Sequence, residues 1–133
     1  MKIHHIGIAC HNIEKSRDAY KELGYIVIQE LIADKSRNLD YIFLKNNHET
    51  IELVSVNDKS IKSDIDTILK SSRMGCNSIY HFCYQSNDIL ADITNFKSKG
   101  YKLIKKPEPT IVCENRLVAF LFHSDIGLIE LIQ

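Results

Sequence analysis

The sequence predicts an α+β protein made of two tandem β-α-β-β-β modules, and three observations support this fold class. A shift of 76 positions (81 − 5) places His5 on His81 without a gap. Each copy contains a helical apolar stripe that ends at a Gly-Tyr pair. Glu52 and Glu130 recur late in each copy at a shift of 78 (130 − 52). Such self-similarity indicates repeated supersecondary units that pack their apolar faces together.

The first copy predicts a strand, a helix and three further strands. Side chains alternate across a strand, so His5 shares its face with the small residues Gly7 and Ala9. The helical stripe ends at Gly24, a residue suited to a left-handed C-terminal stop. The expected order is strand 2–9, helix 13–23, strand 25–31, turn 33–38, strand 40–44, turn 46–49 and strand 50–56.

The second copy predicts the same order after a link. Residues 57–77 contain turn residues, apolar positions between 61 and 69 that suit a short helix, and a loop over 71–77. Pro107 and Pro109 predict a loop within the copy. The expected order is strand 79–85, helix from 89 to Gly100, strand 101–105, strand 116–123 and strand 128–132. We therefore expect one domain, 1–133, with module 1 at about 1–56 and module 2 at about 78–133.

The composition is that of a globular protein with no strong electrostatic preference. Of the 133 residues 44% are hydrophobic and 26% charged, and 17 basic residues balance 17 acidic ones. This balance argues against nucleic acid or an anionic membrane surface as a partner. The four cysteines have no C-x-x-C spacing, and the sequence shows neither a secretory leader pattern nor a membrane-spanning apolar run. We expect a reduced, soluble, cytoplasmic protein.

Four polar residues are expected to form a metal site: His5, Glu52, His81 and Glu130. Each lies mid-strand among apolar neighbours, where a polar group is costly unless it is paired, hydrogen-bonded or bound to a metal. A mixed set of imidazoles and carboxylates suits a first-row divalent ion such as Ni²⁺, Co²⁺, Zn²⁺ or Mn²⁺. Four ligands in an octahedral shell leave two positions for water or substrate.

The other histidines lack this support. A single histidine in a strand is more often a hydrogen-bonded structural residue than a ligand. We therefore expect structural roles for the four histidines without a repeat partner, and also for Cys83, since a buried cysteine usually behaves as a small hydrophobe. These histidines are His4, His11, His48 and His123.

The motifs around the four expected ligands resemble a known superfamily. The segments are HHIGIA at 4–9, IELV at 51–54, YHF at 80–82 with NDI at 87–89, and VAFL at 118–121 with GLIEL at 127–131. They are similar to the vicinal oxygen chelate (glyoxalase/bleomycin resistance/dioxygenase) superfamily, in particular its glyoxalase I and methylmalonyl-CoA epimerase branch. The resemblance implies two modules in a U-shaped mixed sheet around one divalent ion (Ni²⁺, Co²⁺ or Zn²⁺), and a homodimer. The implied ligands are His5, Glu52, His81 and Glu130.

The resemblance further implies a metal-dependent lyase or isomerase that moves a proton next to a carbonyl through a stabilised enediolate. Because glyoxalase I carries a Glu at the second ligand position, as at Glu52, we expect a lactoylglutathione lyase-like reaction, from a 2-oxoaldehyde–thiol hemithioacetal to a thioester. The alternatives are an acyl-CoA epimerase like methylmalonyl-CoA epimerase and a non-catalytic small-molecule-binding or resistance protein.

The residues expected to act on the substrate are two carboxylates and three further polar residues near the strand ends. Glu130 is the first candidate for the base, with Glu52 as its repeat-related partner. Arg116, Asn115 and Arg37 are expected to meet the charge of a small-molecule substrate, either a thiol adduct or an acyl thioester.

Overall fold

The computed structural model describes residues 1–133, apart from the side chain of Arg73. The chain forms two compact units, one made of residues 1–5 and 81–133 and the other of residues 6–80. The boundaries fall inside β1 (Ile3–Ala9) and β5 (Ser78–Gln85), so each of these strands passes from one unit to the other. Among the described residues, no helix is long and apolar enough to cross a membrane.

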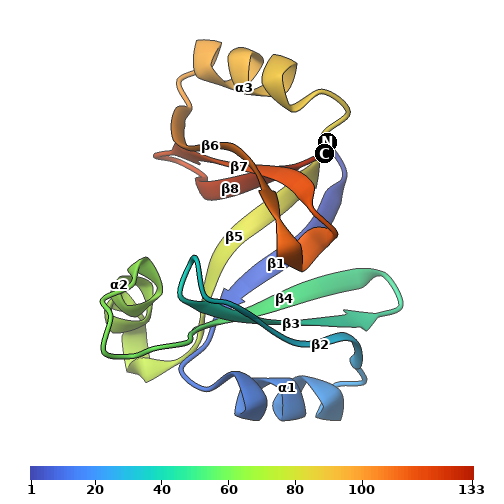
Figure 1. The fold of residues 1–133 in the computed structure, drawn as a ribbon, viewed down its shortest axis with the longest axis vertical. Coiled ribbons are helices and arrows are strands. Elements are labelled where there is room, and N and C mark those ends of the chain that lie inside the picture. The colour runs from blue at the N-terminus through green and yellow to red at the C-terminus, as the bar shows by residue number, and fades with distance from the viewer. The chain divides into compact units, whose positions relative to one another are not determined.

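In the unit 6–80, one helix covers one face of a mixed sheet (Figure 1). Strand β1 pairs in parallel with β4, and β3 pairs antiparallel with both β4 and β2. Helix α1 starts after Asn12, whose side chain accepts a hydrogen bond from the Lys15 N–H. The elements are α1 (Ile13–Glu22), β2 (Ile26–Asp34), β3 (Leu39–Asn46) and β4 (Glu49–Val56). The core between helix and sheet consists of Ile8, Cys10, Ile13, Ile42, Leu44, Ile51 and Leu53.

A short helix follows β4, as the sequence predicts, but it begins later than the apolar spacing indicates. Helix α2 (Asp64–Ser71) starts after Ser63, and a capping box joins this residue with Asp66. The capping residues therefore set the start of the helix, while Ile65 and Leu69 are its buried side chains. A 3₁₀ turn, η1 (Arg73–Gly75), leads to β5.

The unit 1–5 and 81–133 repeats this arrangement. Strand β5 pairs in parallel with β8, and β7 pairs antiparallel with β8 and β6. The Gln85 N–H donates to the Lys2 carbonyl, which attaches β5 to the beginning of the chain. The elements are α3 (Ile89–Ser98), β6 (Lys102–Thr110), the 3₁₀ turn η2 (Ile111–Cys113), β7 (Arg116–His123) and β8 (Gly127–Ile132). Its helix–sheet core consists of Ile89, Ile93, Ala119, Leu121, Ile129 and Leu131.

The α+β class and the repeated β-α-β-β-β order are thus confirmed, with strands hydrogen-bonded in the order β2-β3-β4-β1-β5-β8-β7-β6. The predicted loop at Pro107 and Pro109 is wrong, because both residues lie within β6. Strand β6 is an edge strand, and its register shifts between Lys105 and Glu108. Proline lacks an N–H donor and is tolerated at an edge or a bulge, where no ladder bond is lost.

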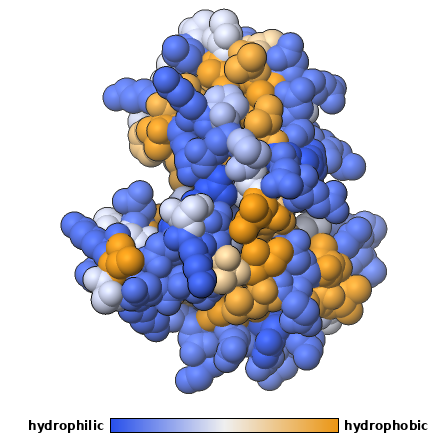
Figure 2. Space-filling model, viewed as in Figure 1, coloured by the Kyte–Doolittle hydropathy of each residue, from blue (hydrophilic) through white to orange (hydrophobic). Residues whose placement is uncertain are grey.

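Each half-sheet carries its predicted ligand carboxylate on the face opposite its helix. Ile51 and Leu53 pack toward α1, so Glu52 between them faces away. Ile129 and Leu131 likewise pack toward α3, and Glu130 faces away. Apolar side chains also reach the surface of both units, as Figure 2 shows. The exposed large residues of the two edge strands include Ile26, Ile28, Leu31 and Ile104.

Candidate metal centre

Three of the four expected ligands lie within one unit and meet at one point. His5 Nε2 lies 3.1 Å from His81 Nε2 and 3.2 Å from Glu130 Oε2. His81 Nε2 lies 3.1 Å from the same carboxylate oxygen. All three residues are buried, with exposed fractions of 1%, 2% and 6%. Two imidazole nitrogens and one carboxylate oxygen therefore form a nearly equilateral triangle inside the protein.

The strand pattern of this unit places the three groups. His5 comes from β1, His81 from β5 and Glu130 from β8. Glu130 stands opposite Cys83 on β5 and opposite Phe120 on β7. The Phe120 ring also meets the His81 ring edge to face, with centroids 5.4 Å apart. Backbone pairing and this aromatic contact hold the His81 imidazole in place.

The donor set fits a divalent cation. Ligand atoms about 2.1 Å from a metal are separated by about 3.0 Å at right angles and about 3.4 Å at the tetrahedral angle. The three measured separations of 3.1, 3.1 and 3.2 Å lie between these values. Although Glu130 Oε2 lies at ion-pair distance from both imidazoles, it accepts no hydrogen bond of good geometry among the described atoms. A buried carboxylate oxygen in that position is suited to accept a cation.

The electrostatics favour an ionised Glu130 carboxylate and disfavour a protonated His5. Burial by itself raises the pKa of Glu130, but His81 and His5 outweigh it and hold that pKa well below its usual range. Burial lowers the pKa of His5, although Glu130 opposes this shift. A neutral imidazole and an ionised carboxylate are the forms that ligate metal ions. The site is therefore prepared for a cation at neutral pH.

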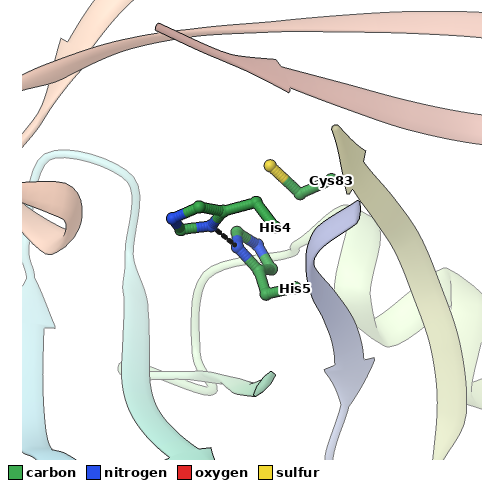
Figure 3. A group of neighbouring side chains, drawn as sticks. All are labelled: His4, His5 and Cys83. Atoms are coloured by element: carbon green, nitrogen blue, oxygen red, sulfur yellow. Dashed lines mark hydrogen bonds between the residues drawn. The ribbon is translucent and has the colours of Figure 1, made fainter. Parts of the chain in front are cut away.

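A second group of side chains adjoins the triangle through His4. The Nδ1 atoms of His4 and His5 lie 2.8 Å apart, and Arg116 Nη1 lies 3.2 Å from His4 Nε2. Cys83 Sγ lies close to both imidazoles (Figure 3), and the three ligand atoms lie within 4.8 Å of one another. Burial, then His5 and then Arg116, lowers the pKa of His4 to about 4. His4 is therefore neutral at pH 7.

Sequence reasoning gave His4 and Cys83 structural roles, and the structure places both beside the metal centre. Adjacent residues in a strand point to opposite faces, so the sequence predicts His4 away from His5. The side-chain rotamers nevertheless bring the two Nδ1 atoms together. The only sequence signal was the His-His pair itself.

The remaining predicted site residues have different surroundings. Glu52 is buried on β4 in the unit 6–80, opposite Gly7 and Phe43, and stays a predicted ligand. Arg116 contacts His4, as described above. Asn115 is exposed in the turn before β7, with a φ of 61°. Arg37 Nη1 donates to Asp34 Oδ2 at 3.1 Å. The substrate roles of Arg116, Asn115 and Arg37 stay predictions.

The fold and this cluster define a class of protein: a duplicated β-α-β-β-β domain with a buried His-His-Glu cluster that could hold a metal ion. The chain belongs to the Glyoxalase/Bleomycin resistance protein/Dioxygenase superfamily, because the profile of that family matches residues 4–120. The predicted superfamily is thereby confirmed.

Two relatives that match nearly the whole chain are epimerases. The mitochondrial methylmalonyl-CoA epimerase of Dictyostelium discoideum is 26% identical over 132 residues, which cover 98% of this chain and 76% of that protein. The ethylmalonyl-CoA/methylmalonyl-CoA epimerase of Cereibacter sphaeroides is 26% identical over 134 residues, covering 99% and 97%.

Solved structures show the same fold. A hypothetical protein from Bacillus halodurans has a TM-score of 0.81 at 25% identity, over 98% of this chain and 92% of that one. A Streptomyces coelicolor methylmalonyl-CoA epimerase variant, in complex with 2-nitronate-propionyl-CoA, has a TM-score of 0.79 at 22% identity, over 99% and 96%.

These comparisons confirm the prediction of an enzyme, and of the two predicted types, lyase or isomerase, they support the isomerase. They support the epimerase alternative better than the glyoxalase I reaction, which we had expected from the carboxylate at Glu52. Lyase activity and a specific preference for nickel or zinc therefore have no support from the relatives. The residue at the second expected ligand position, Glu52, was too weak a signal to separate the two reactions.

Proposed function

We propose that this protein is an acyl-CoA epimerase that inverts the α-carbon of methylmalonyl-CoA or a closely related 2-substituted malonyl thioester. The observation that carries the proposal is the buried triangle of His5, His81 and Glu130, in a chain whose relatives along nearly its whole length include methylmalonyl-CoA epimerases. Epimerisation requires a proton to leave the carbon next to the thioester carbonyl and to return on the opposite face.

In this proposal His5, His81 and Glu130 hold one divalent ion, and Glu52 is the fourth ligand. A bound divalent ion supplies a Lewis acid for the thioester oxygen as negative charge develops there. The two neutral imidazoles contribute no charge, while the carboxylate contributes one negative charge. The role of Glu52 rests on its repeat relation to Glu130 and on its burial beside Gly7.

The proton transfers are assigned to the two carboxylates. Glu130 turns Oε2 toward the imidazoles, so its second oxygen, Oε1, is proposed to exchange the proton on one face of the α-carbon. Glu52 is proposed to exchange it on the other face. His81 and His5 lower the pKa of Glu130, so its carboxylate is ionised and able to accept a proton.

The substrate's charged and apolar parts have candidate partners in the chain. Arg116 carries a guanidinium that matches carboxylate or phosphate groups with paired donors. Phe120 stands opposite Glu130, on the same face of β7 as the exposed Phe122, and these two rings offer apolar surface to the acyl chain.

Solvent deuterium exchange tests the proposal directly. The protein is stripped of metal, incubated with methylmalonyl-CoA in D₂O with and without Co²⁺, Ni²⁺ or Zn²⁺, and the α-hydrogen is followed by NMR and mass spectrometry. We expect metal-dependent exchange with inversion. Absence of exchange with every metal, under conditions where metal binds stoichiometrically, would reject the proposed reaction. A parallel assay of methylglyoxal with thiols reports whether any glyoxalase activity accompanies it.

A further inference from the structure

We propose that metal capture at His5 reverses a hydrogen-bond chain through His4 and thereby releases Arg116 to bind an anionic group of the substrate. The inference rests on the metal role given above. It concerns three side chains of one unit, Arg116, His4 and His5. His4 is a positioning residue in this scheme, since it acts through the two residues on either side.

The direction of the chain without metal follows from donor chemistry. A guanidinium can only donate, so His4 Nε2, 3.2 Å from Arg116 Nη1, must accept. The neutral His4 ring then carries its proton on Nδ1 and donates to His5 Nδ1 at 2.8 Å. The neutral His5 ring in turn carries its proton on Nε2, which faces His81 Nε2 at 3.1 Å and Glu130 Oε2 at 3.2 Å. Every donor points inward, toward the metal centre.

Metal ligation requires the opposite direction. His5 can bind a cation through Nε2 only with a free lone pair there, so its proton must lie on Nδ1. Nδ1–H of His5 then donates to Nδ1 of His4, and the His4 proton moves to Nε2. That N–H faces the guanidinium of Arg116, and two donors cannot hydrogen-bond to each other.

The proton balance of this reversal is even. One proton leaves His5 Nε2, the proton between the two Nδ1 atoms passes from His4 to His5, and one proton from solvent binds His4 Nε2. Neither ring changes its net charge, so the switch is a change of tautomer. Its outcome is a guanidinium that has lost its partner on His4 and is available to a carboxylate or phosphate. The ion and the anionic group are thus coupled, and each favours the binding of the other.

The tautomers can be read directly. In protein with ¹⁵N-labelled histidine, two-bond ¹H–¹⁵N spectra distinguish Nδ1–H from Nε2–H for His4 and His5. Without metal we expect Nδ1–H on His4 and Nε2–H on His5, and with Zn²⁺ alone the reverse on both. If His4 keeps Nδ1–H when Zn²⁺ is bound at His5, or carries Nε2–H before Zn²⁺ is added, the proposal is overturned.

A double-mutant cycle separates the switch from simple charge repulsion. In Arg116→Leu the donor that fixes the inward direction is gone, and we expect Zn²⁺ to bind about tenfold more tightly, the size of one charged hydrogen bond. A positive charge removed from the neighbourhood could also raise affinity. In the background of His4→Phe the switch predicts that Arg116→Leu has no further effect, whereas a purely Coulombic effect persists.

The matched control is Arg17→Leu, which removes an arginine of the other unit and should leave Zn²⁺ affinity unchanged. Circular dichroism of the metal-free variants checks that each is folded. An effect of Arg116→Leu that is equally large with and without His4 would reject the relay. Failure of the deuterium exchange assay with methylmalonyl-CoA would leave these binding and NMR results intact, so the two proposals fail separately.

Discussion

Replacing Glu130 by Gln should weaken metal binding in a protein that still folds. The side chain supplies the only carboxylate oxygen of the triangle, 3.2 and 3.1 Å from its two imidazole partners. Structural Zn²⁺ sites contribute about 10 to 16 kcal/mol over four ligands, or about 3 kcal/mol for each ligand. Because an amide oxygen is a poorer ligand than a carboxylate, we expect Zn²⁺ to bind about a hundredfold more weakly.

The same substitution is nearly isosteric and removes a buried charge from the metal-free protein. Burial opposes the ionised form of Glu130, and the imidazoles compensate for it. The lowered pKa of Glu130 means that the imidazoles more than offset this burial cost, so a neutral amide should reduce the unfolding free energy of the metal-free protein. The Zn²⁺ affinity is therefore compared on folded protein, where it distinguishes a ligand from a residue that only stabilises the fold.

The assay is a competition titration of Zn²⁺ against a chromophoric chelator, together with urea unfolding of the metal-free proteins. Glu22→Gln, an exposed position on α1, is the matched control and should change neither quantity. A Glu130→Gln variant that binds Zn²⁺ within about threefold of the parent would refute the assignment of Glu130 as a ligand.

Three further results are expected. The metal-free protein should lose unfolding free energy as the pH falls from 6.5 to 4, because His4 has a pKa of about 4 when folded and 6.5 when unfolded, so the unfolded chain binds the extra proton. His4→Phe should reduce this loss by about 1 to 2 kcal/mol, after allowance for solvent screening of a half-buried ring. Urea unfolding at each pH measures the loss, and an unchanged loss in the variant would show that other groups cause it. Glu52→Gln should lower the rate of α-hydrogen exchange of methylmalonyl-CoA by about 10²-fold or more. Its loss of Zn²⁺ affinity should be smaller than that of Glu130→Gln. An exchange rate equal to that of the parent would reject the role of Glu52 in proton transfer. Leu131→Ala should cost about 2 to 5 kcal/mol of unfolding free energy, because the side chain is fully buried. Leu90→Ala, at 66% exposure, should change the unfolding free energy by about 0.5 kcal/mol or less. Equal effects of the two substitutions would contradict the packing described for α3.

The clustering of His5, His81 and Glu130 could be predicted because strand alternation and the repeat give independent information. His5 and His81 occupy matching positions, and Glu130 lies between two residues that pack under α3. Alternation therefore assigns all three to the helix-free face. The same rule failed at His4, because it fixes the direction of the Cα–Cβ bond but not the rotamer that brings the two Nδ1 atoms together.

Element boundaries were harder to predict where hydrogen bonding outweighs apolar spacing. The Ser63 capping box starts α2 later than the first apolar position at Ile61. Pro107 and Pro109 are loop residues by propensity, yet β6 needs few of its own N–H groups because only one neighbour pairs with it. Sequence patterns report such edge positions poorly, since strand order is a property of the assembled sheet.

The two edge strands of the duplicated fold have diverged in a way that bears on self-association. Strand β6 carries Pro107, Pro109 and several lysines, features that prevent an additional strand from docking along its open side. Its counterpart β2 has neither proline nor lysine, and it exposes Ile26 and Ile28. Any intermolecular sheet formed when this protein is stressed should therefore grow from β2.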